Sequence, residues 1–463
     1  MPSRGRSAAR GMPWSGTGRA VTVLVCPLDG VNGADGGLGA NAVWRALRRR
    51  EGLRARIVPG SPTANLTRDG GLVALLARTQ HVGRTWLTDS GADALIWGQR
   101  AGNMLRLSVI SSDPRRAAEE PLGLHPWSTI QVPMPITETA AEILHAMVLI
   151  AVTPSRELAS RTRRHRRRAL RHAMARAETR MLGGRARSGV IVEGYRVALG
   201  LVQRAHGLLT RDPVRLARAV RLMETGLNGL TKSWPTDLLA LARLDWADTV
   251  LALPDDPGAD AGFAAALADA RLDTVVAACR AGAARLSPIA LPDAYAAAHV
   301  SLARALWRKA GRDGDADGFD AALSALTAAA WVWTRDGDPE RRRILLTAMG
   351  AILRDRVIHA SGGDASIRAV LEMIAPDEDI VLRAWAQAAL GVTLIWSKTG
   401  AADPGADAMA ALGEAVATFE SLGMTDAAGL ARTQMDGAAD AWAHRVAAAD
   451  STGRIVAFQR RRA

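Results

Sequence analysis

The sequence predicts a small α+β domain at the amino terminus followed by an all-α helical-repeat solenoid, and therefore a chain that is mostly helical. Three observations support this fold class. Short β-branched runs alternate with helical patterns up to about residue 154, whereas only helical patterns follow. Pro, Gly and Asp separate the successive helical stretches. Two segments 89 residues apart resemble each other, which is typical of internal repeats.

Composition narrows the function classes. With 48% hydrophobic and 23% charged residues, the chain is globular rather than disordered. Two cysteines exclude a disulfide scaffold and a Cys-rich zinc site, and they favour a reducing, cytoplasmic location. The absence of any Gly-Lys dipeptide excludes a Walker-type phosphate loop. The longest apolar run, residues 143–152, has half the length that a membrane-spanning helix needs, so we expect no transmembrane segment.

The basic charge is concentrated in three segments. The net charge is +13, yet residues 161–187 alone carry +10, and the first twenty and the last ten residues carry +4 each. The rest of the chain is therefore mildly acidic. From these shifts we expect five parts: a disordered basic leader at 1–20, an α/β domain at 21–154, an Arg-rich connecting helix at 155–189, helical repeats at 190–447 and a basic tail at 448–463.

The α/β domain is predicted to run in the order β-α-β-α-β-β-β-α. We expect strands at 21–27, 53–59, 94–98, 104–110 and 129–134, and helices at 41–50, 72–88 and 137–152. A Gly-rich loop that extends through Gly39 joins the first strand to the first helix. The strand end at Pro27-Leu28, the helix approach at 34–36 and the paired segments 92–98 and 105–109 resemble the amino-terminal domain of TolB. That resemblance implies a small α/β fold and no common set of catalytic residues.

The helical part contains an internal repeat. Leu306-Trp-Arg-Lys-Ala-Gly311 is similar to Ile395-Trp-Ser-Lys-Thr-Gly400, and an Asp/Gly-rich loop and an Ala-Ala-Leu segment follow each copy. The offset corresponds to two units of about 44 residues. The small and large residues of the first copy resemble tetratricopeptide repeats of bacterial proteins: Leu302, Ala303, Leu306, Gly311, Phe319, Ala322, Leu326 and Ala329. This resemblance implies stacked helix pairs that bind a protein or peptide in a groove.

The sequence shows no pattern that predicts catalysis. It contains neither an HExxH motif, nor His and Cys at zinc spacing, nor a Gly-x-Ser-x-Gly elbow, so we expect no enzyme, no cofactor and no metal. The Gly-rich loop is the alternative, because Gly36, Gly37 and Gly39 could bind a nucleotide phosphate through backbone N–H groups. Since only part of the dinucleotide fingerprint is present, we favour a flexible connection.

Two tryptophans are candidates for partner binding. Trp331 and Trp333 lie two residues apart in a predicted helix, so they cannot share a face. Core packing is the simplest interpretation for tryptophans in stacked helices. We nevertheless expect one of these two at the surface, where an exposed ring would anchor a partner.

The Arg-rich segment is the other candidate for partner binding. Leu170, Met174, Ala177 and Met181 recur at helical spacing and predict one docking face. The remaining faces carry arginines that suit an acidic protein, a phosphate-bearing molecule or a membrane surface: Arg163, Arg164, Arg167, Arg168 and Arg171. A solvated linker helix is the simpler interpretation. Nucleic acid is disfavoured as a partner because residues 161–187 contain no aromatic ring to stack on bases.

These patterns together favour a non-enzymatic adaptor or scaffold that binds protein partners through its helical repeats, in bacterial signalling or regulation. One alternative is a small-ligand or nucleotide sensor that uses the α/β domain. A second alternative is a nucleic-acid-binding protein that uses residues 161–187.

Overall fold

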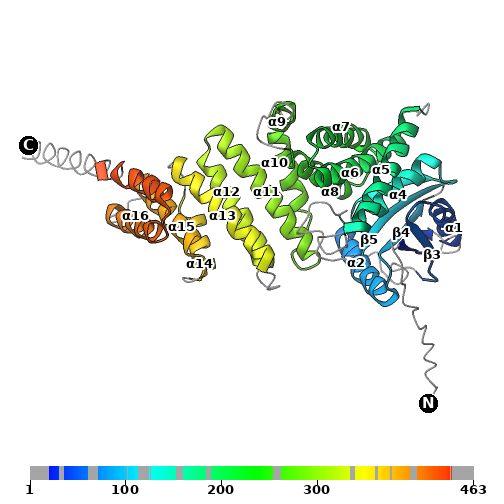
Figure 1. Cartoon of the computed structure of the whole chain (residues 1–463), viewed down its shortest axis with the longest axis horizontal. Helices are drawn as coiled ribbons and strands as arrows, with labels where there is room; N and C mark the ends of the chain where they lie inside the picture. The colour runs from blue at the N-terminus through cyan, green and yellow to red at the C-terminus, as the bar shows by residue number, and fades with distance from the viewer. Residues whose placement is uncertain are drawn as a thin grey trace, which may run out of the picture. The chain divides into compact units, whose positions relative to one another are not determined.

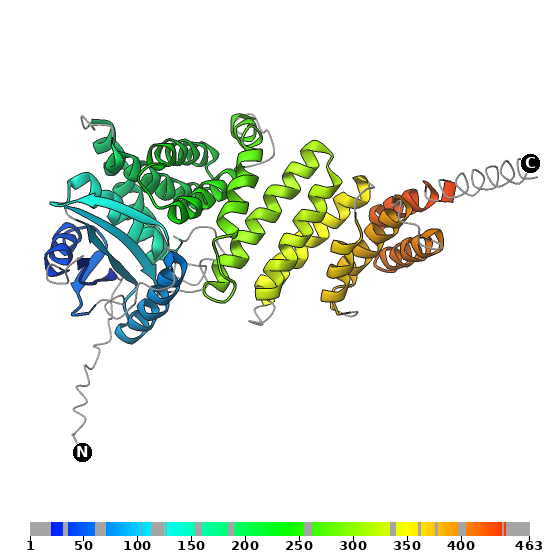
Figure 2. The ribbon, with the colours of Figure 1, turned by 180° about the vertical axis from the view of Figure 1, so that it is seen from behind.

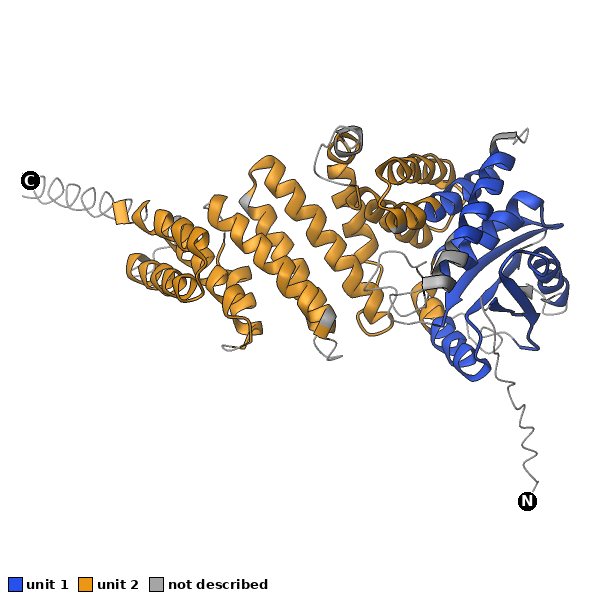
Figure 3. Cartoon of the chain, viewed as in Figure 1, with its two compact units in different colours: residues 1–67, 78–114, 128–202 blue, residues 68–77, 115–127, 203–463 orange. Residues whose placement is uncertain are grey.

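The computed structural model describes most of the chain between residues 20 and 440. The described ranges are 20–30, 36–60, 71–101, 103–112, 125, 127–152, 160–183, 189–253, 262–333, 339–359, 363–375, 378–396, 404–437 and 439–440. Within them the backbone alone is described at 29–30, 36, 101, 160–167, 182–183, 209, 262–265, 316, 340, 396 and 404. The predicted basic tail and all but the last residue of the predicted leader lie outside these ranges. The chain forms two compact units (Figure 3): unit 1 comprises residues 1–67, 78–114 and 128–202, and unit 2 comprises residues 68–77, 115–127 and 203–463.

Unit 1 is built on a mixed sheet (Figure 1). Its strands are β1 (Val21–Val25), β2 (Asp29–Gly30), β3 (Leu53–Ile57), β4 (Ala94–Ala101), β5 (Met104–Ser111) and β6 (Thr129–Pro133). The strand order is β3-β1-β4-β5-β6, with the short β2 beside β4. β1 pairs in parallel with β3 and β4, whereas β4, β5 and β6 are antiparallel. The parallel pairs need crossover connections, which contain α1 (Gly36–Leu47) and α2 (Gly71–Ser90).

The pairing of β4 with β5 depends on Gly98. A Cβ atom at this position would lie 2.0 Å from the carbonyl oxygen of Arg106, so the strands can approach this closely only because residue 98 has no side chain. Gly98 pairs with Leu107, and Ile96 and Leu105 on either side of this pair are buried in the core of unit 1.

Helix α4 (Glu138–Ala151) is the central helix of unit 1. It begins after Thr137, whose hydroxyl accepts a hydrogen bond from the backbone N–H of Ala140 at 3.2 Å. Residues 140–151 are all buried because α4 packs against both β5 and helix α5 (Ser160–Gly183). The apolar run that the sequence places here thus belongs to a core helix. In the described part of the chain, no helix is long and apolar enough to cross a membrane.

Helices make up the described regular structure of unit 2. After α6 (Val190–Thr210), within which the division between the units falls, come α7 (Pro213–Leu230), α8 (Thr236–Leu251), α9 (Gly262–Asp269), α10 (Leu272–Ala283), α11 (Pro292–Asp313), α12 (Ala316–Trp333), α13 (Pro339–His359), α14 (Ala365–Met373), α15 (Ile380–Trp396) and α16 (Pro404–Ser421). Residues 425–437 are also helical. α10 packs on α11, α11 on α12 and α12 on α13, and both views show α11, α12 and α13 side by side (Figures 1 and 2).

The helix pairs α11–α12 and α15–α16 share several buried positions. At the predicted offset of 89 residues, buried positions coincide: Leu306 with Ile395, Leu323 with Leu412, and Phe319 with Ala408. In the second pair the rings of Trp385 and Phe419 are in contact, with centroids 4.8 Å apart. The corresponding residues of the first pair are the buried Ala296 and Ala330, so a large pair in one copy replaces a small pair in the other.

The predicted order of elements in the α/β domain is confirmed, with β2 as an addition. The predicted start of the first helix is wrong, because α1 begins at Gly36 rather than at residue 41. Gly36, Gly37 and Gly39 therefore lie in the helix and not in a loop. Glycine disfavours helix, but burial of Val43 and Leu47 stabilises α1 through tertiary packing.

Candidate functional site

Helix α5 carries the Arg-rich segment and docks within unit 1 through an apolar face. Leu170, Ala173, Met174 and Ala177 are buried, which confirms the predicted docking face except for Met181, which is only partly buried. The candidate residues Arg168 and Arg171 are exposed. Arg163, Arg164 and Arg167 lie on the helical backbone of α5, and their side chains are outside the described part of the structure.

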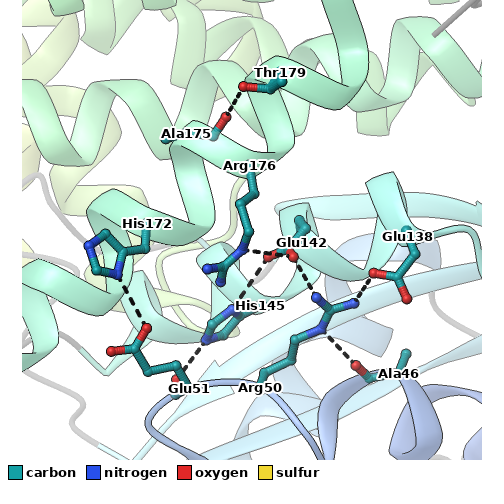
Figure 4. Close-up of polar contacts among 10 residues, drawn as sticks. All are labelled: Ala46, Arg50, Glu51, Glu138, Glu142, His145, His172, Ala175, Arg176 and Thr179. Atoms are coloured by element: carbon teal, nitrogen blue, oxygen red, sulfur yellow. Dashed lines mark hydrogen bonds and ion pairs between the residues drawn. The ribbon is translucent and has the colours of Figure 1, made fainter. Parts of the chain in front are cut away.

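A cluster of ion pairs fastens α5 and the turn after α1 to α4 (Figure 4). Its centre is the carboxylate of Glu142, whose side chain is 1% exposed. Arg176 of α5 donates to Glu142 Oε1 from Nε at 2.9 Å, and Arg50 of the turn donates to the same oxygen. Arg50 also donates to Glu138 Oε2 at 2.6 Å. One buried carboxylate thus connects three elements of unit 1.

Two histidines complete this cluster. His145 Nε2 lies 2.9 Å from the backbone carbonyl oxygen of Glu51, and its Nδ1 lies 3.8 Å from Glu142 Oε2. His172 of α5 lies 3.3 Å from the carboxylate of Glu51. Figure 4 shows the turn, α4 and α5 converging on these side chains.

The charge state of Glu142 follows from its partners. Burial alone would raise its pKa, but the nearby His145 and the hydrogen bond from Arg176, together with the positive charges of Arg50 and Arg176, lower the pKa below its ordinary value. Glu142 is therefore ionised at neutral pH and cannot act there as a proton donor. Its chemistry suits a permanent ionic link between elements.

A second buried polar cluster lies in unit 2. Asp245 and Asp248 lie one turn apart on α8 and face His125 and Trp127. Trp127 Nε1 donates to Asp245 Oδ2 at 3.1 Å, and His125 Nε2 lies 3.3 Å from Asp245 Oδ1. The His125 ring stacks on Trp127 with centroids 4.4 Å apart. The segment that carries these two rings is thus held on α8.

Burial is the largest cause of the pKa shifts in this second cluster. It lowers the pKa of His125 to about 3, with a further contribution from the charge of Arg204, so the imidazole is neutral. Burial also raises the pKa of Asp248, against the opposing effects of Arg204, Ser301 and Arg304. The thiol pKa of the neighbouring Cys279 is raised well above its usual value, so this sulfur is not a thiolate at neutral pH.

The three glycines proposed for nucleotide binding have different surroundings. A Cβ at Gly39 would lie 2.9 Å from Leu28 Cδ1 and 3.3 Å from Leu105 Cδ2, so the small residue is needed for core packing. Gly37 is exposed and faces open space, and Gly36 is the first residue of α1. Close packing against Leu28 and Leu105 is therefore sufficient to explain why residue 39 is a glycine.

The two candidate tryptophans separate as their spacing predicts. Trp331 is 55% exposed, whereas Trp333 is 2% exposed and cannot serve as a surface anchor. The guanidinium of Arg341 lies 5.7 Å from the ring centroid of Trp333 and pairs with Asp293 at 2.7 Å. Arg341 thus lies on the side of α12 that Trp333 faces, whereas Trp331, two residues earlier, faces another side of the helix.

The sequence alone did not predict either buried cluster, although each has a recognisable feature in the sequence. Glu142 interrupts an apolar helix, and Asp245 and Asp248 recur at i, i+3 in another. A carboxylate in an otherwise apolar helical face needs a buried partner. The identity of that partner depends on the tertiary fold, because Arg50 and His125 are remote in sequence.

Comparisons with known proteins add no family. The chain matches no protein-family model, no curated protein and no solved structure. Within the described residues, no group of three or more His, Cys, Asp or Glu side chains is arranged to hold a metal ion.

Proposed function

We propose that the protein is a non-enzymatic adaptor that binds a protein or peptide partner on the helical repeats of unit 2, with Trp331 as an anchor. The observation that carries this proposal is the exposed indole of Trp331 on α12, a helix of the duplicated helix pairs. Tryptophan is among the residues most enriched where alanine substitution most weakens protein binding.

The duplicated helix pairs support a repeat architecture of the tetratricopeptide type. Equivalent buried positions recur at an offset of 89 residues, and each helix from α10 to α13 contacts the next along the chain. A stack of such pairs presents one helix of each repeat along an extended surface, which suits an elongated partner.

The exposure of Trp331 supports a binding role. A large exposed aromatic ring is costly to solvate, and core packing is satisfied at this end of α12 by the buried Trp333.

Site-specific cross-linking tests this function. A photoreactive phenylalanine analogue is placed at residue 331 of the full-length protein, and a control protein carries it at residue 289, where Ile289 is 87% exposed. We expect a discrete cross-linked protein from cells of the source organism at 331 and not at 289. In the unmodified chain, Trp331→Ala should weaken binding of that protein at least tenfold, since hot-spot losses are about 2 kcal/mol or more.

Two outcomes would overturn the adaptor function. One is an identical pattern of cross-links at 331 and 289, because contact at both sites would be non-specific. The other is unchanged affinity of the cross-linked protein for the Trp331→Ala variant.

A further inference from the structure

The outer face of α5 and the turn after α1 lie side by side in unit 1. His172 of α5 contacts Glu51 of the turn at 3.3 Å, and the position of a Cβ on Gly52 lies 3.9 Å from Ala169 Cβ. The exposed residues Arg48 and Arg49 precede these contacts in the turn, and the exposed Arg168 and Arg171 flank them on α5. We call these four arginines the basic surface.

The charge of the basic surface is not neutralised within the described part of the protein. Arg49, Arg168 and Arg171 form no ion pair with a described residue, and Arg48 stacks over the Trp44 ring at 4.7 Å. Glu51, the carboxylate between the two groups, pairs with His172. Unit 2 differs, since many of its arginines pair with carboxylates, such as Arg271 with Glu224.

The arginine positions of α5 are unfavourable for the isolated helix. Arg164, Arg167, Arg168 and Arg171 occupy positions i, i+3, i+4 and i+7 of α5, a spacing at which like charges destabilise a helix by about 0.2–0.5 kcal/mol per pair. They also lie in the amino-terminal half of α5, the end at which the helix dipole favours anions. A bound anionic partner would remove both penalties.

We propose that the basic surface binds an acidic α-helical segment of a partner protein. Carboxylates at i, i+3, i+4 and i+7 of a partner helix repeat the spacing of the arginine positions of α5, of which Arg168 and Arg171 are exposed and suited to pair with them. The protein already binds a carboxylate with arginines from these two elements, because Glu142 accepts hydrogen bonds from Arg50 and Arg176. This surface is separate from the repeat surface around Trp331 and does not depend on the adaptor function.

The described side chains favour a protein helix over nucleic acid or a membrane. The Trp44 indole N–H donates to the Ala55 carbonyl oxygen at 3.2 Å and Arg48 covers its ring, so it does not offer a stacking face for a base. Neither α5 nor residues 48–52 present a large exposed apolar side chain among those described, so a lipid bilayer would find no residue to insert.

Binding measurements with designed peptides test the proposal on the full-length protein. One fluorescent helical peptide of about 20 residues carries Glu in the i, i+3, i+4, i+7 stripe, and a second peptide of equal composition distributes the same Glu residues around the helix. We expect the striped peptide to bind at least tenfold more tightly than the second. Binding should weaken steeply as salt rises towards about 0.15 M.

The variant Arg168→Glu/Arg171→Glu should weaken binding of the striped peptide at least tenfold. Arg243→Glu, which reverses an exposed arginine of unit 2, is the matched control and should leave binding unchanged. Far-ultraviolet circular dichroism and melting establish that each variant is folded, and Arg168→Gln/Arg171→Gln provides a milder change at the same sites.

Three results would overturn the proposal. The first is equal affinity for the two peptides. The second is tighter binding of duplex DNA or of phosphatidylserine vesicles than of the striped peptide, which would assign the surface to another class of partner. The third is a loss of binding in Arg243→Glu equal to that in the variants of α5.

Discussion

Glu142 shows how one residue can connect three elements. It lies in the apolar helix α4, and its carboxylate accepts hydrogen bonds from the turn after α1 and from α5. Burying a carboxylate is costly unless charged partners satisfy it. The turn and α5 must therefore both be in place before α4 can bury this residue favourably.

Replacing Glu142 with Gln should lower the free energy of unfolding by about 1–3 kcal/mol, because Arg50 and Arg176 lose a charged acceptor. The folded pKa of Glu142 lies below its ordinary value of 4.5. Its stabilisation is thus present above pH 4.5 and is lost as pH falls towards the folded pKa. Urea denaturation at neutral and acidic pH should show this loss in the wild type and not in Glu142→Gln.

The control for this experiment is Glu138→Gln. Glu138 also pairs with Arg50, but its side chain is 62% exposed, so we expect a change below about 1 kcal/mol. Equal effects of the two substitutions would contradict the central role of Glu142.

His125 should make stability depend on pH in a different range. Its pKa is near 6.5 in the unfolded chain and about 3 in the folded protein. Between these values the unfolded state binds a proton that the native state does not, so the free energy of unfolding falls as pH drops below 6.5. The slope reaches at most about 1.4 kcal/mol per pH unit. Denaturation of His125→Asn between about pH 7 and 5 should lack this contribution, whereas the exposed control His81→Asn should retain it.

At the scale of elements, periodicity predicts most of unit 1 and the helices of unit 2. Strands and helices of the α/β domain occur in the predicted order, because β-branched runs and helical spacing report the local burial pattern. The predicted start of α1 is wrong because periodicity reports only local preferences. Three glycines disfavour helix locally, but packing of residues farther along α1 overrides that preference.

The candidate sites are predictable to a smaller extent. Spacing alone separates Trp331 from Trp333, and it identifies the docking face of α5. It does not reveal that the turn after α1 extends the basic face of α5, since Glu51 and His172 meet only in the folded chain. Contacts between remote elements carry no local pattern in a single sequence.

Contact between α15 and α16 depends on Gly391. A Cβ there would lie 2.7 Å from Leu412 Cγ and 2.9 Å from the Ala408 carbonyl oxygen, so Gly391→Ala must force the helices apart. We expect a loss of about 1–3 kcal/mol of unfolding free energy. Gly413→Ala, on α16 and facing open space, should instead stabilise the protein by up to about 1 kcal/mol. Opposite signs in chemical denaturation would confirm the close helix contact.

At the scale of the whole molecule, the amino-terminal part of the chain is basic and most of the helical part is acidic. Residues 1–202 carry a net charge of +16, residues 203–440 carry −7 and residues 441–463 carry +4. Such an asymmetry directs acidic partners towards the amino-terminal part and leaves the helical part with paired surface charges. The two proposed binding surfaces therefore differ in chemistry: one is basic and the other has an aromatic centre.

Cooperativity across unit 2 can be tested with two phenylalanines that are buried in its described part. Phe319 and Phe419 belong to different helix pairs, and their ring partners are His359 and Trp385. Each Phe→Leu substitution should lower the unfolding free energy by about 1–1.5 kcal/mol. Without a shared partner, the double variant should lose the sum within about 0.5 kcal/mol, in a single transition by circular dichroism. A second transition would instead show that the two pairs unfold separately.

The contrast between Trp385–Phe419 and Ala296–Ala330 has a consequence for protein engineering. A chimera that moved α12 alone into the place of α16 would bring Phe319 to the site of Ala408 and leave Trp385 opposite an alanine. The larger ring would overcrowd the site of Ala408, and the loss of the Phe419 ring would leave a void beside Trp385. Whole helix pairs would therefore have to be moved together, because each pair has its own complementary packing.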